Sequence, residues 1–159
     1  MDKQFKTGDV VLFNYNNKNW ISKQIENYNL QEYGTSSAIH AGIISEVNYN
    51  ENKVQIFEIL NLNGANFYYY DMNFLTEKIK SNEIHIRRPK ENIKNIIENC
   101  EKYLYIKYGI LDLFAILLYG FFNIKIKSTN MKKVICSELV ARVLYDSSKI
   151  YIFHIISYI

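Results

Sequence analysis

Cysteine is scarce in this sequence: only Cys100 and Cys136 occur among 159 residues. Two cysteines are too few for the disulfide framework of a small secreted domain. The opening segment, Met1–Lys6, is largely polar and charged and does not resemble a secretory signal. We therefore expect both thiols to be reduced and the protein to be cytoplasmic.

Several sequence motifs that mark cofactor sites or enzyme classes are also missing. No C-x-x-C, H-x-x-x-H or H-E-x-x-H spacing is present, so little points to a metal site. Gly-rich phosphate loops and the G-x-S-x-G elbow of serine hydrolases are absent as well. The residue types of Cys136, His40, His85 and Glu58 could ligate zinc, but without such spacing we expect no cofactor and no metal.

The chain lacks both a basic cluster and a long hydrophobic run. Its net charge is only +3, and Lys and Arg are dispersed without a run of five or more. Nucleic-acid-binding proteins usually concentrate these residues on one element, so we expect no nucleic-acid partner and interpret the Arg87–Arg88 pair as solvated surface. The apolar stretch 110–122 contains Asp112 and is too short to span a bilayer comfortably. No membrane span is expected, and peripheral membrane association stays open.

Apolar residues make up 48% of the chain, enough to build a core in a single domain covering residues 1–159. Short apolar runs bounded by turn residues predict strands at 10–13, 39–44, 54–60 and 84–88. Helical spacing predicts helices at 20–28, 91–104 and 110–122, another that starts at Cys136, and a strand or core-covering tail at 149–159. Strands gather in the first half and helices in the second, which favours an α+β fold.

Cys136 is the first candidate for chemistry, because an extended segment turns into an amphipathic helix at this residue. A helix N-terminus offers unpaired N–H groups and a partial positive charge, both of which stabilise a thiolate. The same amides, in the turn that contains Ser137, can receive an oxyanion. A buried cysteine on an apolar stripe is the competing interpretation. It is the one that we adopt for Cys100, which lies mid-helix among isoleucines.

His40 and Glu58 are the other two candidates. His40 opens an apolar strand, and histidine is the usual base for a thiol nucleophile near neutral pH. Glu58 lies on the same strand face as Val54, Ile56 and Leu60, where a carboxylate is costly to bury unless it has a partner. An imidazole N–H is such a partner and would fix the histidine tautomer. The alternatives are a half-exposed histidine at a strand end and a solvated glutamate.

Four blocks of the sequence resemble the circularly permuted NlpC-type papain-like proteins, most closely the YiiX-like branch. The blocks are Gly8-Asp9-Val10-Val11-Leu12-Phe13, Ser37-Ala38-Ile39-His40-Ala41-Gly42-Ile43, Val54-Gln55-Ile56-Phe57-Glu58 and Cys136-Ser137-Glu138-Leu139-Val140. In that superfamily the histidine strand precedes the nucleophile helix, the reverse of ordinary papain order. The same order occurs here.

The resemblance implies a fold and a set of roles. The fold would be a small antiparallel sheet or half-barrel packed against helices. The nucleophile would be Cys136, the base His40 and the third polar residue Glu58. Ser137 and Tyr108 would contribute substrate or oxyanion contacts, and Asp9 would form a structural turn.

Three functions are compatible with these residues. The first is a cysteine peptidase or amidase that acts by acyl transfer on an amide, ester or thioester. The second is a lipid acyl hydrolase or acyltransferase, which the aromatic run Phe67-Tyr68-Tyr69-Tyr70 and the apolar stretch 110–122 favour slightly. The third is a non-enzymatic binding module with a papain-like fold. The expected partner is a peptide or lipid-like acyl substrate, and the sequence does not indicate an oligomeric state.

Overall fold

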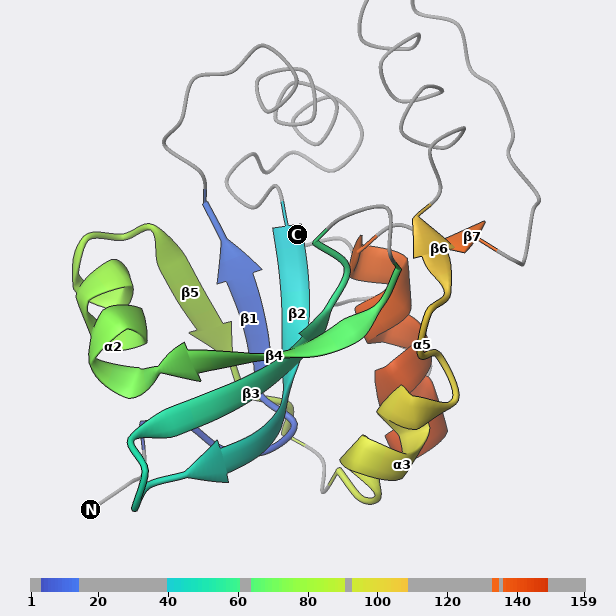
Figure 1. The fold of residues 1–159 in the computed structure, drawn as a ribbon, viewed down its shortest axis with the longest axis horizontal. Helices are drawn as coiled ribbons and strands as arrows, with labels where there is room; N and C mark the ends of the chain where they lie inside the picture. The colour runs from blue at the N-terminus through green and yellow to red at the C-terminus, as the bar shows by residue number, and fades with distance from the viewer. Residues whose placement is uncertain are drawn as a thin grey trace, which may run out of the picture.

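The computed structural model describes residues 4–14, 40–60, 64–90, 93–108, 133–134 and 136–148 (Figure 1). Within these ranges the chain forms an open five-stranded sheet in the order β4-β3-β2-β1-β5, and every neighbouring pair is antiparallel. Its strands are β1 Val10–Phe13, β2 His40–Asn48, β3 Lys53–Glu58, β4 Asn66–Asp71 and β5 Ile84–Arg87. The helices are α2 Met72–Lys80, α3 Ile96–Glu101 and α5 Cys136–Ser148. The predicted α+β class is confirmed.

Two apolar clusters cover opposite sides of this sheet. Alternation along β1 divides its side chains between them: Val10 and Leu12 join the first cluster, and Val11 and Phe13 join the second. The first cluster packs under α3 and α5, whereas α2 covers the second (Figure 1). Because β1 is buried on both faces, its sequence is a continuous apolar run rather than an alternating one.

In the five-stranded sheet and the helices that cover it, the sequence patterns did not predict β4 and α2. The aromatic run Phe67-Tyr68-Tyr69-Tyr70 lies in β4, along one edge of the described sheet. Asp71 then caps α2, because its carboxylate accepts hydrogen bonds from the backbone N–H groups of Asn73 at 2.8 Å and Phe74 at 3.1 Å. The chain therefore passes from an edge strand directly into the helix on the second cluster.

The predicted helix at 91–104 is shorter than its apolar stripe suggested. It begins only at Ile96, because Asn95 has a left-handed backbone with φ of 53°. Ile97, which belonged to the predicted stripe, is 44% exposed. The predicted strand at 54–60 also ends early, at Glu58, and Leu60 is exposed. The expected elements at 20–28, 110–122 and 149–159 lie outside the described residues.

The last described helix, α5, begins at Cys136 as predicted. Its buried face consists of Cys136, Leu139, Val140, Val143 and Leu144, which is the predicted stripe. A two-residue strand, β7 Lys133–Val134, precedes it and pairs in parallel with β6 Lys107–Tyr108. No described helix has the length and hydrophobicity to cross a bilayer.

Arg87 and Arg88 are both exposed, in agreement with the interpretation as solvated surface, but Arg88 also pairs with a buried carboxylate. Its guanidinium Nε and Nη2 lie 2.8 and 2.9 Å from the two carboxylate oxygens of Asp9, which is 1% exposed. The Asp9 carboxylate also accepts a hydrogen bond from the Lys6 N–H at 2.8 Å. Burial of the Asp9 carboxylate requires these partners, so Arg88 fixes the turn that begins β1.

Candidate active site

Two of the three predicted site residues meet across neighbouring strands. His40 is the first residue of β2 and Glu58 the last of β3. Their side chains approach to 2.6 Å between Nε2 of the ring and Oε2 of the carboxylate. Glu58 is fully buried, and the His40 side chain is 14% exposed. The carboxylate therefore has the imidazole partner that its burial on a sheet demands.

Gly42 makes this approach sterically feasible. The strand register pairs Ile43 with Phe57, so Gly42 and Glu58 are the next opposed residues. A methyl group on Gly42 would come within 3.2 Å of Glu58 Cβ and within 2.6 Å of Ile56 Cγ2. Real Cβ atoms do not tolerate the second distance. The missing side chain leaves room for Glu58 on the sheet surface beside His40.

The thiol of Cys136 forms a hydrogen bond with the His40 side chain, so the structure brings all three predicted residues together. Burial by itself raises the pKa of this thiol. The hydrogen bond and charge of His40, together with backbone hydrogen bonds from Ala41 and Ser137, outweigh burial and hold the Cys136 pKa below its usual range. These contacts therefore stabilise the thiolate relative to that of an ordinary cysteine.

The pKa of His40 is raised, whereas that of Cys136 is lowered. Its burial lowers the pKa, but hydrogen bonds and charge from Cys136 and Glu58 raise it to about 10. The ring of Phe13 lies alongside, with ring centroids 5.1 Å apart and an interplanar angle of 41°. An imidazolium between a thiolate and a carboxylate is the arrangement that these shifts describe.

A fourth polar residue, Tyr70, was not predicted as part of the site. Its hydroxyl donates a hydrogen bond of 2.5 Å to Oε1 of Glu58. The sequence carried no signal for this contact, because Tyr70 lies within an uninterrupted aromatic run whose strand pairing was not predicted. Each oxygen of the Glu58 carboxylate therefore has its own partner, Tyr70 on Oε1 and His40 on Oε2.

Ser137, Tyr108 and His85 are the other residues that the sequence analysis considered for the site. Ser137 follows the nucleophile in α5 and contributes its backbone to the sulfur. Tyr108 lies in β6, where its backbone is paired with Val134. His85, the other histidine considered as a zinc ligand, lies in β5 opposite Leu12 and is half-buried. Across the described ranges, no group of three His, Cys, Asp or Glu side chains is arranged to hold a metal.

The second cysteine has the opposite character. Cys100 is fully buried in the first cluster, as predicted for a core residue. Burial, followed by the nearby charge of Glu101, raises its pKa to about 12. A thiol in this state is a poor nucleophile.

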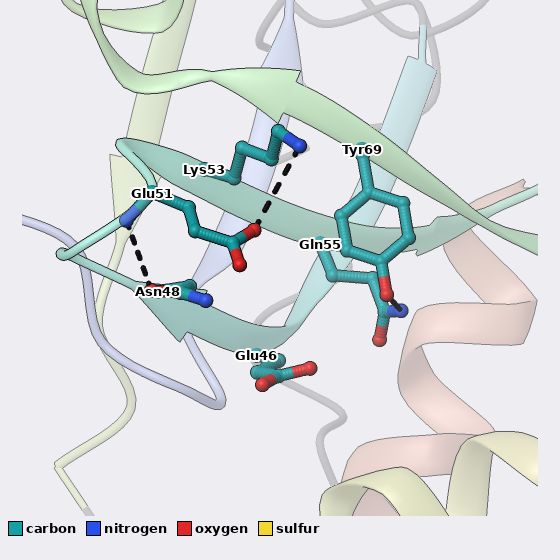
Figure 2. A pocket seen from close by; sticks show the side chains of 6 residues that line it. All are labelled: Glu46, Asn48, Glu51, Lys53, Gln55 and Tyr69. Atoms are coloured by element: carbon teal, nitrogen blue, oxygen red, sulfur yellow. Dashed lines mark hydrogen bonds and ion pairs between the residues drawn. The ribbon is translucent and has the colours of Figure 1, made fainter.

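A separate polar hollow of about 280 Å³ lies on the sheet at the β2–β3 hairpin (Figure 2). Its lining residues are Glu46, Asn48, Glu51, Lys53, Gln55 and Tyr69. Gln55 Nε2 donates to the Tyr69 hydroxyl at 2.7 Å, and Lys53 Nζ lies 3.7 Å from Glu51 (Figure 2). None of the residues around Cys136 belongs to this hollow.

Comparison with known proteins gives a relationship in fold. No family model matches the sequence, and no curated protein matches it. Among solved structures, the chain is similar to the crystal structure of metalloprotein yiiX from Escherichia coli O157:H7. The TM-score is 0.56 at 17% identity, over 94% of this chain and 70% of that one. The chain thus has a YiiX-like α+β fold.

Proposed function

We propose that this protein is a cysteine hydrolase with a circularly permuted papain-like fold, which acts by acyl transfer on an amide, ester or thioester. The observation that carries the proposal is the position of His40, hydrogen-bonded on one side to Cys136 and on the other to Glu58 at 2.6 Å. This chemistry requires a nucleophile that is hydrogen-bonded to a base, and a carboxylate that is hydrogen-bonded to the same base and orients it.

The first half of the reaction forms an acyl-enzyme. The proton of the Cys136 thiol resides on His40, and the thiolate attacks the carbonyl carbon of the substrate. Backbone N–H groups in the first turn of α5, that of Ser137 included, receive the oxyanion of the tetrahedral intermediate. As the intermediate collapses, the carbonyl–heteroatom bond breaks, and His40 returns its proton to the leaving amine, alcohol or thiol.

The second half releases the acyl group. His40 removes a proton from a water molecule, which attacks the thioester carbon, and the carbon–sulfur bond breaks to give a carboxylic acid and the thiolate–imidazolium pair. Glu58 holds Nε2 throughout, so Nδ1 is the ring nitrogen that can exchange protons with the sulfur. An acyl acceptor other than water would make the same protein an acyltransferase.

The order of the elements supports the permuted assignment. The strand that bears His40 comes before the helix that bears Cys136, and the β3 carboxylate lies between them in sequence. We take residues 1–159 as one domain of this class. The similar yiiX structure is described as that of a metalloprotein, so metal binding is the competing function. In the described part of this chain, however, no three His, Cys, Asp or Glu side chains are arranged to hold a metal. The short Nε2–Oε2 hydrogen bond also favours the nucleophile, because a metal would have to displace it.

The decisive experiment is to trap the acyl-enzyme. The protein is incubated with activated peptide esters, lipid esters and acyl thioesters, and its intact mass and peptide map are recorded. We expect an acyl adduct on Cys136 from at least one class, and the class identifies a peptidase or a lipid hydrolase. The Cys136→Ala variant should form no adduct, and the Cys100→Ala variant should form it normally.

Three results would contradict the proposal. Adduct formation in the Cys136→Ala chain would remove the nucleophile assignment. Complete inertness of a folded wild-type protein toward all three classes would favour the binding module. Loss of reactivity on treatment with EDTA, restored by zinc, would favour a metal centre.

A further inference from the structure

The Tyr70 hydroxyl contacts the proposed centre, but it has no part in the proposed chemistry. Tyr70 lies in β4, opposite Val54 of β3. Its ring packs against the second apolar cluster, on the side of the sheet that α2 covers. Its hydroxyl nevertheless reaches Oε1 of Glu58. The contact therefore joins the edge strand of the described sheet to the buried carboxylate.

The strand register explains why this position is a tyrosine. Asn66, not Tyr70, is the residue directly opposite Glu58, and Tyr70 is opposite a residue four places earlier on β3. Four residues of strand correspond to about 13 Å along the sheet. A serine or threonine hydroxyl at position 70 could not bridge that offset, whereas an aromatic side chain with a terminal hydroxyl extends along the strand.

Because Glu58 is buried, the loss of its hydrogen bond with Tyr70 would be energetically costly. The residue is 0% exposed, so a carboxylate oxygen that lost its protein donor would face an apolar surrounding. Without the Tyr70 hydroxyl, Oε1 would lose the donor that the described residues give it, and the carboxylate would be freer to rotate about its last torsion. The hydroxyl removes this freedom, because Oε1 is occupied and only Oε2 points at the ring.

We propose that Tyr70 is a positioning residue that fixes the Glu58 carboxylate in the orientation that holds the His40 ring against Cys136. The inference rests on the proposed function, because it assigns Tyr70 to the same centre. In this scheme Tyr70 acts through Glu58 and takes no part in making or breaking bonds. The titratable groups that face one another are Cys136 from α5, His40 from β2, and Glu58 and Tyr70 from β3 and β4.

The test follows ionisation of the Cys136 thiol, a readout that does not require a known substrate. The rate of alkylation by iodoacetamide is measured between about pH 5 and pH 10, with the site assigned by peptide mapping so that Cys100 does not interfere. In the Tyr70→Phe variant we expect the midpoint of the rate profile to rise by about one pH unit, which is about tenfold in rate on its acidic side. The ring and its packing remain, so only the hydroxyl is removed.

Two further variants separate positioning from packing. Tyr69→Phe is the matched control, because Tyr69 is the next residue of β4 but bonds Gln55 instead; its midpoint should equal that of the wild type. Glu58→Gln should raise the midpoint further than Tyr70→Phe does. In the Glu58→Gln chain, adding Tyr70→Phe should change little, since a neutral amide supplies no charge to orient.

The outcomes distinguish this inference from the function on which it rests. A wild-type midpoint near the ordinary value of about 8.5 would overturn the proposed function. A lowered wild-type midpoint that Tyr70→Phe leaves unchanged, or effects of Tyr70→Phe and Glu58→Gln that simply add, would overturn the positioning role alone. In the wild-type protein the Tyr70 hydroxyl proton should be visible by NMR as a resonance protected from exchange. Rapid exchange with water would contradict the inference without any variant.

Discussion

His40 and Glu58 are eighteen positions apart in the sequence, yet Nε2 of one lies 2.6 Å from Oε2 of the other. The antiparallel pairing of β2 with β3 produces this contact, because it brings the start of one strand beside the end of the next. The ring therefore has a fixed orientation before any substrate arrives. Such preorganisation is what general-base catalysis by an imidazole requires.

Replacing Glu58 by glutamine should slow turnover without abolishing it. The amide keeps the shape of the side chain but no longer stabilises the imidazolium, so we expect kcat/KM to fall by about 10- to 100-fold. Cys136→Ala should reduce turnover to background. Glu83→Gln is the matched control, because that carboxylate pairs on the surface with Lys78. Equal activity of Glu58→Gln and the wild type would show that the carboxylate has no part in the reaction.

The pH dependence of turnover should be bell-shaped, with each limb assigned to one residue. The thiolate exists above the lowered pKa of Cys136, and the imidazolium persists until pH approaches the His40 pKa of about 10. Activity should therefore fall on acidification as sulfur is protonated, and fall again in strong alkali as the ring loses its proton. Alkylation, which needs only the thiolate, should keep the acid limb and lack the alkaline one. An alkylation profile with the same alkaline decline would contradict this assignment.

The glycine at position 42 should be irreplaceable for both stability and activity. In Gly42→Ala the new methyl group collides with Ile56 Cγ2 at 2.6 Å and crowds Glu58 Cβ at 3.2 Å. We expect the free energy of unfolding to fall by about 1–3 kcal/mol. At temperatures where the variant is still folded, the displaced carboxylate should also reduce turnover. If Gly42→Ala had the melting temperature and the activity of the wild type, the strands would be able to move apart here without cost, which would contradict this prediction.

Loss of the buried carboxylate of Asp9 should destabilise the fold without altering the reactive thiol. In Asp9→Ala the Lys6 N–H and the Arg88 guanidinium lose the carboxylate as an acceptor. We expect a loss of about 1–3 kcal/mol, or about 2–4 °C in melting temperature for each kcal/mol in a chain of this length. Glu51→Ala, which breaks an exposed pair with Lys53, should hardly change the melting temperature. A large effect of Glu51→Ala would contradict the distinction between the two pairs.

Local patterns were sufficient for α5, which carries Cys136, and for β1, which pairs with the strand of His40. The apolar stripe of α5 and the run of β1 follow directly from helical spacing and from burial on two faces. The same reasoning failed at β4, because Phe67-Tyr68-Tyr69-Tyr70 has neither alternation nor helical period. It also failed at the start of α3, because nothing in the stripe reveals the left-handed backbone of Asn95.

The candidate site was predictable in its residue types but not in its contacts. A carboxylate on an apolar strand face indicated that Glu58 needs a partner, and His40 was the best available one. The register of β3 against β4 determines that Tyr70 binds one oxygen of the Glu58 carboxylate and leaves the other facing the His40 ring. Register is set by pairing across the sheet, so these contacts were invisible to reasoning along a single strand.

Because Glu58 has no surface open to solvent, dissolved salt cannot gather around its charge. At physiological ionic strength, screening acts over about 8 Å of water, and no water layer separates this carboxylate from the imidazole. The Arg142–Glu138 pair on the outside of α5 is open to such screening, since those side chains are 27% and 44% exposed. The His40–Glu58 contact should therefore be much less sensitive to ionic strength than the surface pair, and salt that weakens surface ion pairs should leave the His40 ring aligned.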